Sequence, residues 1–258
     1  MSQHQITSET VARTIARVRE QAPRVHVITN SVAEAFTANL LLAAGAVPSM
    51  TSSAEEVADF VSGAGALTVN LGTLDAARRV GIETAIDMAK EGEIPFVLDP
   101  VMADRSPGRC AFALEIARAR PSVLRGNPGE IDSLCRARDL EPLPGALAVA
   151  LRSVVAVTGT TDHVTDGHRV VEIANGHALL SRVTATGCAG AALTAACRAV
   201  EADPILAAVT ALVWMGVAAE QAARLAAAPG GFAVGLIDRI ASLREVDVQA
   251  EARIEVRA

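Results

Sequence analysis

The stretch "SVLRGNPGEIDSLCRA", residues 122–137, decides the fold of this chain. Its first six residues read as a short apolar strand that ends on polar Asn127. Pro128 then suits the first turn of a helix, and a helical pattern follows it. The stretch therefore predicts a strand that leads directly into a helix.

The same alternation runs through most of the chain. Further strands are expected at 24–29, 66–72, 95–101 and 153–159, and the intervening segments have helical patterns, two of which end at Gly45 and Gly92. Residues 162–176 resemble a hairpin at the sheet edge that turns at Asp166-Gly167, residues 188 to about 243 look helical, and the tail "EARIEV" resembles a last strand. Apolar strands separated by long helices predict one α/β domain over 1–258, with a central, mostly parallel sheet flanked by helices on both faces.

Composition narrows the functional classes. Of the 258 residues 51% are apolar and 20% charged, which excludes disorder, and the net charge of −6 without a basic block argues against binding to nucleic acid or to an anionic membrane. The alanine-rich segments are interrupted by charges, so we interpret them as buried helices and expect no membrane span. The first twenty residues lack the apolar block of a signal peptide, and the four cysteines show no paired spacing. These features predict a cytoplasmic protein without zinc.

Polar residues follow five of the expected strands. They are Thr29-Asn30, Asn70-Gly72-Thr73, Asp99, Arg125-Asn127-Glu130 and Thr158-Gly159. In an open parallel sheet the carboxyl ends of the strands form one rim, where ligands bind. The sequence therefore places a site at this rim.

Two groups at this rim suit a nucleotide and its metal. The Arg125 guanidinium suits phosphate oxygens, and Asn127 and Glu130 could hold Mg²⁺ directly or through water, although a helix N-terminus would equally explain Glu130. Asp99 could help to hold the metal or cap its loop, and Thr158 could contact a nucleotide or form a turn.

The stretch "TATGC", residues 184–188, precedes an alanine-rich helix. Its free N–H groups and Gly187 suit a phosphate, but a helix cap followed by close packing explains them equally well. Helix N-termini lower thiol pKa values, so Cys188 could accept a proton, although most lone cysteines are inert core residues. The loops "VITNSV" and "VPSM" look like the substrate side, where Asn30 could form a hydrogen bond and Met50 could pack on a flat ring or in the core.

Seven motifs in order carry a resemblance. They are "HVITN", "AAGAVPSM", "NLGTL", "VLDPV", "LRGNPGEI", "VTGTTDHVTDG" and "NGHALLSRVTATGCAGAAL", between about Arg24 and Ala199. Together they resemble the hydroxyethylthiazole kinases, a ribokinase-like family of thiamine salvage.

The resemblance implies an activity and roles for individual residues. The activity is ATP-dependent phosphorylation of the hydroxyl of 4-methyl-5-(2-hydroxyethyl)thiazole, with Mg²⁺. Cys188 would face the alcohol, and the other implied roles are substrate binding for Met50, Ala185, Asn30 and Gly72, ATP binding for Arg125, Thr158 and Gly187, and metal binding for Asp99, Asn127 and Glu130. The family is typically a homotrimer with active sites between subunits, which agrees with the small-residue composition.

Two features depart from the family pattern, and three other functions are compatible with parts of the sequence. The family usually has glycine at position 185, and small residues where this chain has "MADRSPGR" after "DPV". A kinase of hydroxymethylpyrimidine or a sugar, and a dehydratase that repairs hydrated nicotinamide nucleotides, usually carry Asp in place of Cys188. A nucleotide-binding protein without catalysis, with a site impaired by Ala185, is a third alternative.

Overall fold

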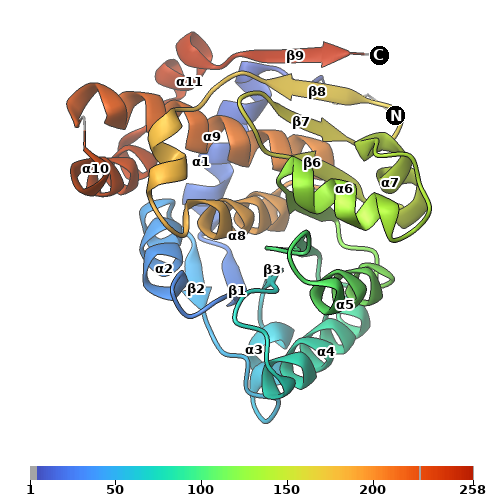
Figure 1. The fold of residues 1–258 in the computed structure, drawn as a ribbon. Helices are drawn as coiled ribbons and strands as arrows, with labels where there is room; N and C mark the ends of the chain where they lie inside the picture. Colours follow the sequence, from blue (N-terminus) through green and yellow to red (C-terminus); the bar gives the residue numbers. More distant parts are fainter. Residues whose placement is uncertain (1–4, 227, 258) are drawn as a thin grey trace.

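A computed structural model describes residues 5–226 and 228–257 (Figure 1). One nine-stranded sheet crosses the molecule in the order β2-β1-β3-β4-β5-β6-β7-β8-β9. Strands β1 to β6 pair in parallel with their neighbours. The pairs β6–β7, β7–β8 and β8–β9 are antiparallel. The strands are β1 (Arg24–Ile28), β2 (Val47–Ser49), β3 (Ala66–Asn70), β4 (Phe96–Asp99), β5 (Val123–Gly126), β6 (Val154–Val157), β7 (Asp162–Thr165), β8 (Val170–Ile173) and β9 (Ile254–Arg257).

Two hydrophobic cores lie on the two faces of this sheet. One core includes buried residues of α1 (Ser8–Gln21), α2 (Glu34–Ala43), α8 (Thr186–Val200), α9 (Pro204–Leu225), α10 (Pro229–Ser242) and α11 (Glu245–Glu251). The other includes buried residues of α3 (Val57–Ser62), α4 (Ala76–Glu91), α5 (Pro107–Ala117), α6 (Pro128–Arg136) and α7 (Pro144–Leu151). Strands that are buried on both faces need the near-continuous apolar runs seen in the sequence. The predicted α/β class with a mostly parallel, doubly covered sheet is confirmed.

The hairpin and the last strand also form as expected. Gly167 turns the hairpin with φ of 93°, a value that favours glycine, and β9 pairs outside β8 and forms the sheet edge. Helix α9 is the described segment with the length and hydropathy of a membrane span, but 89% of its most apolar window is buried inside the protein. It is a core helix, as its interrupted sequence predicts.

One segment differs from its prediction. Residues 47–50 were expected to form a substrate-side loop, but Val47–Ser49 form edge strand β2, parallel to β1. A proline is tolerated in an edge strand, so Pro48 does not prevent the pairing. Met50 follows directly at the carboxyl end of β2.

Candidate active site

The predicted rim at the carboxyl ends of the strands exists, and its polar residues are buried. Asn30, Asn70, Asp99 and Arg125 are between 0% and 9% exposed. They come from the ends of β1, β3, β4 and β5, which are neighbours in the sheet. Buried polar groups are stable only when they are paired or meet a ligand. The rim is therefore a built polar site rather than a solvated edge.

Two amide groups converge on the sulfur of Cys188. Asn30 Nδ2 lies 3.2 Å and Asn70 Nδ2 3.3 Å from Cys188 Sγ. Asn70 Nδ2 also donates to Asp99 Oδ2 at 2.6 Å, and Asn70 Oδ1 accepts the N–H of Gly72 at 3.0 Å. Asn70 thereby links the ends of β3 and β4 to the start of α8. Sequence reasoning placed Asn70 on the rim but gave it no role.

The Cys188 thiol is protonated at neutral pH. Burial raises its pKa to about 11, and the negative charge of Asp99 adds to the rise, while hydrogen bonds from Asn30 and the charge of Arg125 oppose it. The expectation that the helix N-terminus lowers this pKa is therefore wrong. Desolvation of the thiolate is the largest cause of this rise.

Arg125 is a buried cation without a carboxylate partner. Its side chain donates from Nη1 to the Gly187 backbone oxygen at 2.8 Å, and its buried Nε has no hydrogen-bond partner. No ion pair to Arg125 is formed within residues 5–226 and 228–257. Gly190 makes room for it, because a Cβ there would lie 2.8 Å from Arg125 Nη2. A buried guanidinium left unpaired in this way is suited to an anionic ligand.

Helix α8 opens toward the same place. Its N-cap residue, Ala185, offers no side-chain cap and has φ of 73° in the left-handed region, which favours glycine. Thr186 instead secures the preceding turn, donating from Oγ1 to Leu180 O at 2.9 Å and lying 3.2 Å from Val183 O. The first-turn N–H groups of α8 are therefore free of side-chain acceptors from the cap and suit an anion.

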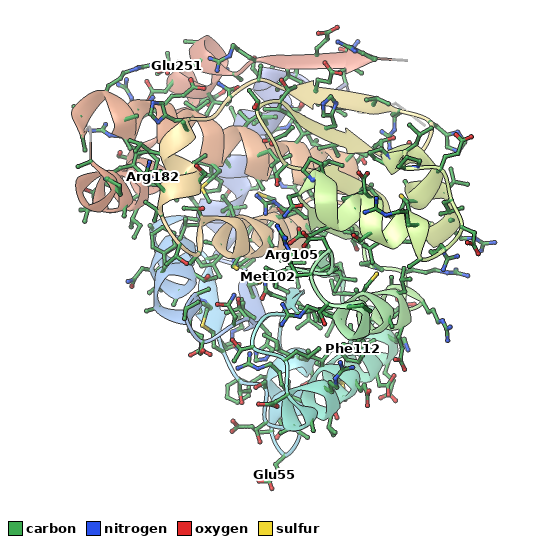
Figure 2. The ribbon with its side chains drawn as sticks, viewed as in Figure 1. Glu55, Met102, Arg105, Phe112, Arg182 and Glu251 are labelled. Atoms are coloured by element: carbon green, nitrogen blue, oxygen red, sulfur yellow. The ribbon has the colours of Figure 1, made fainter. Side chains whose placement is uncertain are left out.

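Asn127 and Glu130 cap helix α6. Asn127 Oδ1 accepts the Glu130 N–H at 3.0 Å, and Glu130 Oε2 accepts the Asn127 N–H at 2.8 Å. Glu130 Oε1 accepts the N–H of Met102, at 2.7 Å, and so holds the loop after β4, where Figure 2 labels Met102 and Arg105. Arg105 lies 3.0 Å from Asp104 in that loop. The interpretation of Glu130 as part of a helix N-terminus is therefore confirmed, and Asn127 is its N-cap residue.

Two buried carboxylates, those of Asp99 and Glu130, lie at the rim. The pKa of Asp99 is raised to about 6, first by burial and then by the charge of Glu130, while Arg125 and Asn70 oppose the rise. Both side chains are 5% exposed, so a cation beside them would relieve their repulsion. No group of three acidic, His or Cys side chains suited to a metal occurs within the described ranges. Two carboxylates and retained waters match the way Mg²⁺ binds together with phosphates.

A cavity of about 540 Å³ adjoins the rim, and it is lined by Arg125, Thr158 and Gly187 among others. These are the three residues that the resemblance assigned to ATP. The remaining walls include Gly159 and Thr160, residues 175–178, 180 and 181, and one side of α9 with Leu212, Met215 and Gly216. Sequence reasoning missed this α9 wall, because a helix that is apolar on all sides gives no sign of which face meets a cavity.

The four expected substrate-side residues lie outside the lining of this cavity. Asn30 adjoins Cys188, and Gly72 packs tightly on Asn30, because a Cβ at Gly72 would lie 2.5 Å from Asn30 Cβ. Ala185 is the N-cap residue of α8, and Met50 lies half-buried at the end of β2. The cavity therefore lies next to the cluster of Asn30, Asn70 and Cys188 and does not include it, since Arg125 and Gly187 line the cavity and Gly187 directly precedes Cys188.

Comparison with known proteins identifies related chains. Residues 15–246 match the model of a family described as the hydroxyethylthiazole kinase family. A hydroxyethylthiazole kinase of Akkermansia muciniphila is 42% identical over 95% of this chain and 96% of its own, and one of Pyrococcus furiosus is 43% identical over 95% and 98%. The solved hydroxyethylthiazole kinase of Pyrococcus horikoshii superposes with a TM-score of 0.92 at 40% identity, over 96% of this chain and 99% of that one. A pyridoxal kinase from Staphylococcus aureus, at 16% identity and a TM-score of 0.66 over 91% of this chain and 98% of that one, shares the fold.

Proposed function

The chain belongs to the hydroxyethylthiazole kinase family, and from this premise we propose that it transfers the γ-phosphoryl group of ATP to the hydroxyl of 4-methyl-5-(2-hydroxyethyl)thiazole. The observation that carries the proposal is the buried, unpaired Arg125 between the 540 Å³ cavity and Cys188. A phosphate group at this position would supply the anion that Arg125 lacks. The transferred group would then lie between the nucleotide and the alcohol.

The residues around the cavity and around Cys188 would have different roles in this reaction. Arg125 and the first-turn N–H groups of α8 neutralise the charge of the transferred group, since phosphoryl transfer depends mainly on positioning and electrostatic stabilisation. Thr158 lines the nucleotide cavity, and Gly187 lets the phosphates approach the backbone closely. Met50, Gly72, Asn30 and Ala185 would surround the thiazole on the other side of Arg125.

Cys188 would lie beside the hydroxyl that becomes phosphorylated. A thiol must lose its own proton before it can take one from the alcohol, and a pKa of about 11 opposes that loss at neutral pH. We propose that Cys188 mainly positions the hydroxyl, with its sulfur held by Asn30 and Asn70. The hydroxyl proton is lost late, when the oxygen already bonds to phosphorus, so a strong base is not needed.

We propose that Asp99 and Glu130 hold Mg²⁺, with Asn127 contributing through water. The ion would supply charge neutralisation for the phosphates, which is the ordinary role of Mg²⁺ in phosphoryl transfer. Both carboxylates are buried at the rim, as such a site requires.

We also propose a cytoplasmic homotrimer with active sites between subunits. Two large apolar side chains on loops next to the site support this assembly: Val32, just after Asn30, is 73% exposed, and Met102, in the loop held by Glu130, is 57% exposed. Exposed apolar groups around a site are typical of an interface. Light scattering coupled to size exclusion measures the mass directly, and a monomer of 26.6 kDa would contradict the proposal.

A coupled ADP-release assay tests the activity. The thiazole alcohol, hydroxymethylpyrimidine and hydrated NADH are compared under the same conditions with ATP and Mg²⁺. We expect the thiazole alcohol to be the preferred substrate, and the phosphorylated product to be seen by mass spectrometry. Preference for the pyrimidine or hydrated NADH would transfer the assignment to those activities, and binding of ATP without any turnover would leave a non-catalytic nucleotide-binding protein.

A further inference from the structure

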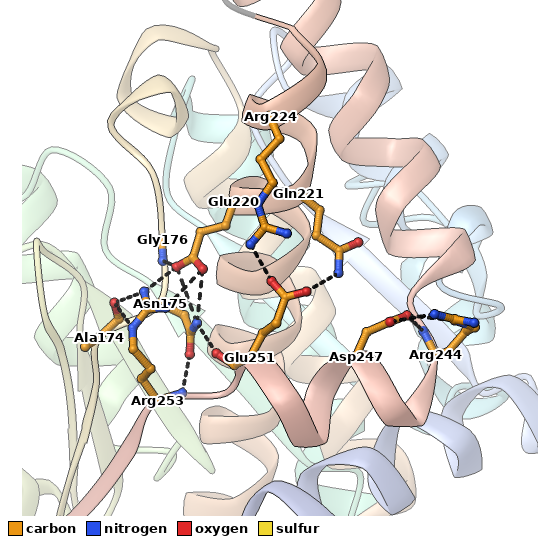
Figure 3. Close-up of polar contacts among 10 residues, drawn as sticks. All are labelled: Ala174, Asn175, Gly176, Glu220, Gln221, Arg224, Arg244, Asp247, Glu251 and Arg253. Carbon is orange, nitrogen blue, oxygen red and sulfur yellow. Dashed lines mark hydrogen bonds and ion pairs between the residues drawn. The ribbon is translucent and has the colours of Figure 1, made fainter.

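The loop between β8 and the 3₁₀ helix Ala178–Arg182 forms one wall of the nucleotide cavity. It contributes Asn175, Gly176 and His177 to the lining, and Ala178 at the start of the 3₁₀ helix continues this wall. Loops gain such definite positions only from specific contacts with the surrounding elements. The polar contacts of residues 174–176 run to helix α9 and to the C-terminal segment (Figure 3).

Helix α9 holds the loop at two points one turn apart. At Gly216 the loop lies directly on the helix, because a Cβ there would be 2.6 Å from Asn175 Cβ and 2.9 Å from its backbone oxygen. At Glu220, Oε1 accepts the backbone N–H of Gly176 at 2.7 Å. Gly216 itself lines the cavity, so the helix that forms one wall also fixes the next.

The side chain of Asn175 is fully used within this network. It is 4% exposed; its Nδ2 donates to Glu251 O at 2.8 Å and lies 3.3 Å from Glu220 Oε1, while its Oδ1 accepts the N–H of Arg253 at 2.7 Å. The Asn175 side chain is therefore engaged in holding the loop, as Figure 3 shows.

Arg253 completes the network from the segment between α11 and β9. It forms an ion pair with Glu220 and donates from Nη2 to Ala174 O at 2.6 Å, while its own backbone oxygen accepts the Ala174 N–H at 3.0 Å. Burial by itself raises the pKa of Glu220, but the hydrogen bonds from Arg253 and Gly176 outweigh it and keep the pKa below its ordinary value. Glu220 is thus an anion that is fixed in place by hydrogen bonds from Arg253, Gly176 and Asn175.

We infer that Glu220, with Arg253 as its counter-ion, is a positioning residue for the nucleotide: it holds the Asn175–Ala178 wall against α9 and so shapes the cavity that receives ATP. The inference rests on the proposed function, because it takes the cavity to be the ATP site. It assigns to the C-terminal segment a part in nucleotide binding that the resemblance did not include.

The test compares Glu220→Ala with a matched control on the same helix. Arg224 lies four residues further along α9 and pairs with Glu251 at 2.7 Å, and it belongs neither to the cavity lining nor to the contacts of residues 174–178. We expect Glu220→Ala to raise the KM for ATP and the Kd for ADP about tenfold, because a charge-assisted hydrogen bond is lost. The KM for the thiazole should stay within about twofold of the wild-type value. Arg224→Ala should leave all three constants within about twofold of wild type.

A second variant and a second readout keep the outcome clear if Glu220→Ala folds poorly. Glu220→Gln retains an oxygen for the Gly176 N–H but loses the ion pair, so the Kd for ADP should rise by about threefold. Hydrogen exchange at residues 174–178 should accelerate in both Glu220 variants and not in Arg224→Ala. A folded Glu220 variant with unchanged ADP affinity, or with equal losses for ATP and thiazole, overturns the inference. Wild-type protein that fails to phosphorylate the thiazole overturns the proposed function instead. In that case the same ADP titrations of wild type and the Glu220 variants still test the role of Glu220.

Discussion

The guanidinium of Arg125 donates a hydrogen bond from Nη1 to the backbone oxygen of Gly187 over 2.8 Å. This bond joins the end of β5 to the first turn of α8, the two elements that border both the cavity and Cys188. It fixes a buried positive charge before any ligand arrives. A preorganised charge needs no rearrangement when the phosphates bind, and that is how such sites stabilise transferred groups.

Gly190→Ala tests whether the position of Arg125 matters. The new Cβ would lie 2.8 Å from Arg125 Nη2, too close for an undisturbed guanidinium, so the side chain must shift. We expect the Kd for ADP to rise about tenfold or more and kcat to fall, as measured by calorimetry and the coupled assay. The control is Gly108→Ala in α5, where a Cβ meets nothing within 4 Å. That change should raise stability by about 0.5–1 kcal/mol without altering the nucleotide Kd, and equal Kd values in both variants would contradict the role of Arg125.

The thiol of Cys188 should alkylate slowly at neutral pH. Its thiolate is the reactive form, and a pKa of about 11 leaves roughly one thiol in a thousand ionised at pH 8. The iodoacetamide rate should therefore rise about tenfold per pH unit from pH 8 to pH 10. Mass spectrometry of the peptide that contains Cys188 measures the rate separately from those of the three buried cysteines. A rate that levels off between pH 8 and pH 10 would show a thiol with an ordinary or lowered pKa, as the helix N-terminus alone would predict.

Ala185 is in the conformation of a glycine. Its φ of 73° costs an alanine about 1 kcal/mol or more, so Ala185→Gly should raise the free energy of unfolding by about 1 kcal/mol. Ala111 is an exposed residue inside α5 with φ outside the left-handed region, and Ala111→Gly should instead lower it by about 1 kcal/mol. Urea titrations monitored by circular dichroism measure both changes. Loss of stability in both variants would mean that the turn before α8 gains nothing from glycine.

Much of the fold could be predicted from the sequence because each buried strand is a short apolar run next to a helical pattern. Strand β2 was missed because three residues that include Pro48 carry too little pattern to separate a strand from a loop. Helices α3 and α7 are also short, at six and eight residues, and give weak periodicity.

The site was predictable to the level of the rim and no further. Parallel strands place Asn30, Asp99 and Arg125 at one edge whatever their order in the sheet. The contact between Asn70 and Asp99 depends on register, since the two residues are direct partners across β3 and β4. The hydrogen bond between the Gly176 N–H and Glu220 depends on how α9 packs, and local sequence does not encode that packing.

Asn70→Ala tests the link between Asp99 and Cys188. The change removes a donor 3.3 Å from Cys188 Sγ and the 2.6 Å hydrogen bond to Asp99, so the sulfur loses one of its two amide neighbours. We expect kcat to fall about tenfold to a hundredfold, because the thiol is no longer fixed beside the substrate hydroxyl, while the Kd for ADP stays within about twofold. The pKa of Cys188 should rise further, since a hydrogen bond to the thiolate is lost, and alkylation at pH 9 should slow accordingly.

Double-mutant analysis with Cys188→Ser completes the test. If Asn70 acts through the sulfur, the double variant will be little slower than Cys188→Ser alone, whereas independent, multiplying losses would show that Asn70 acts on the reaction by another route.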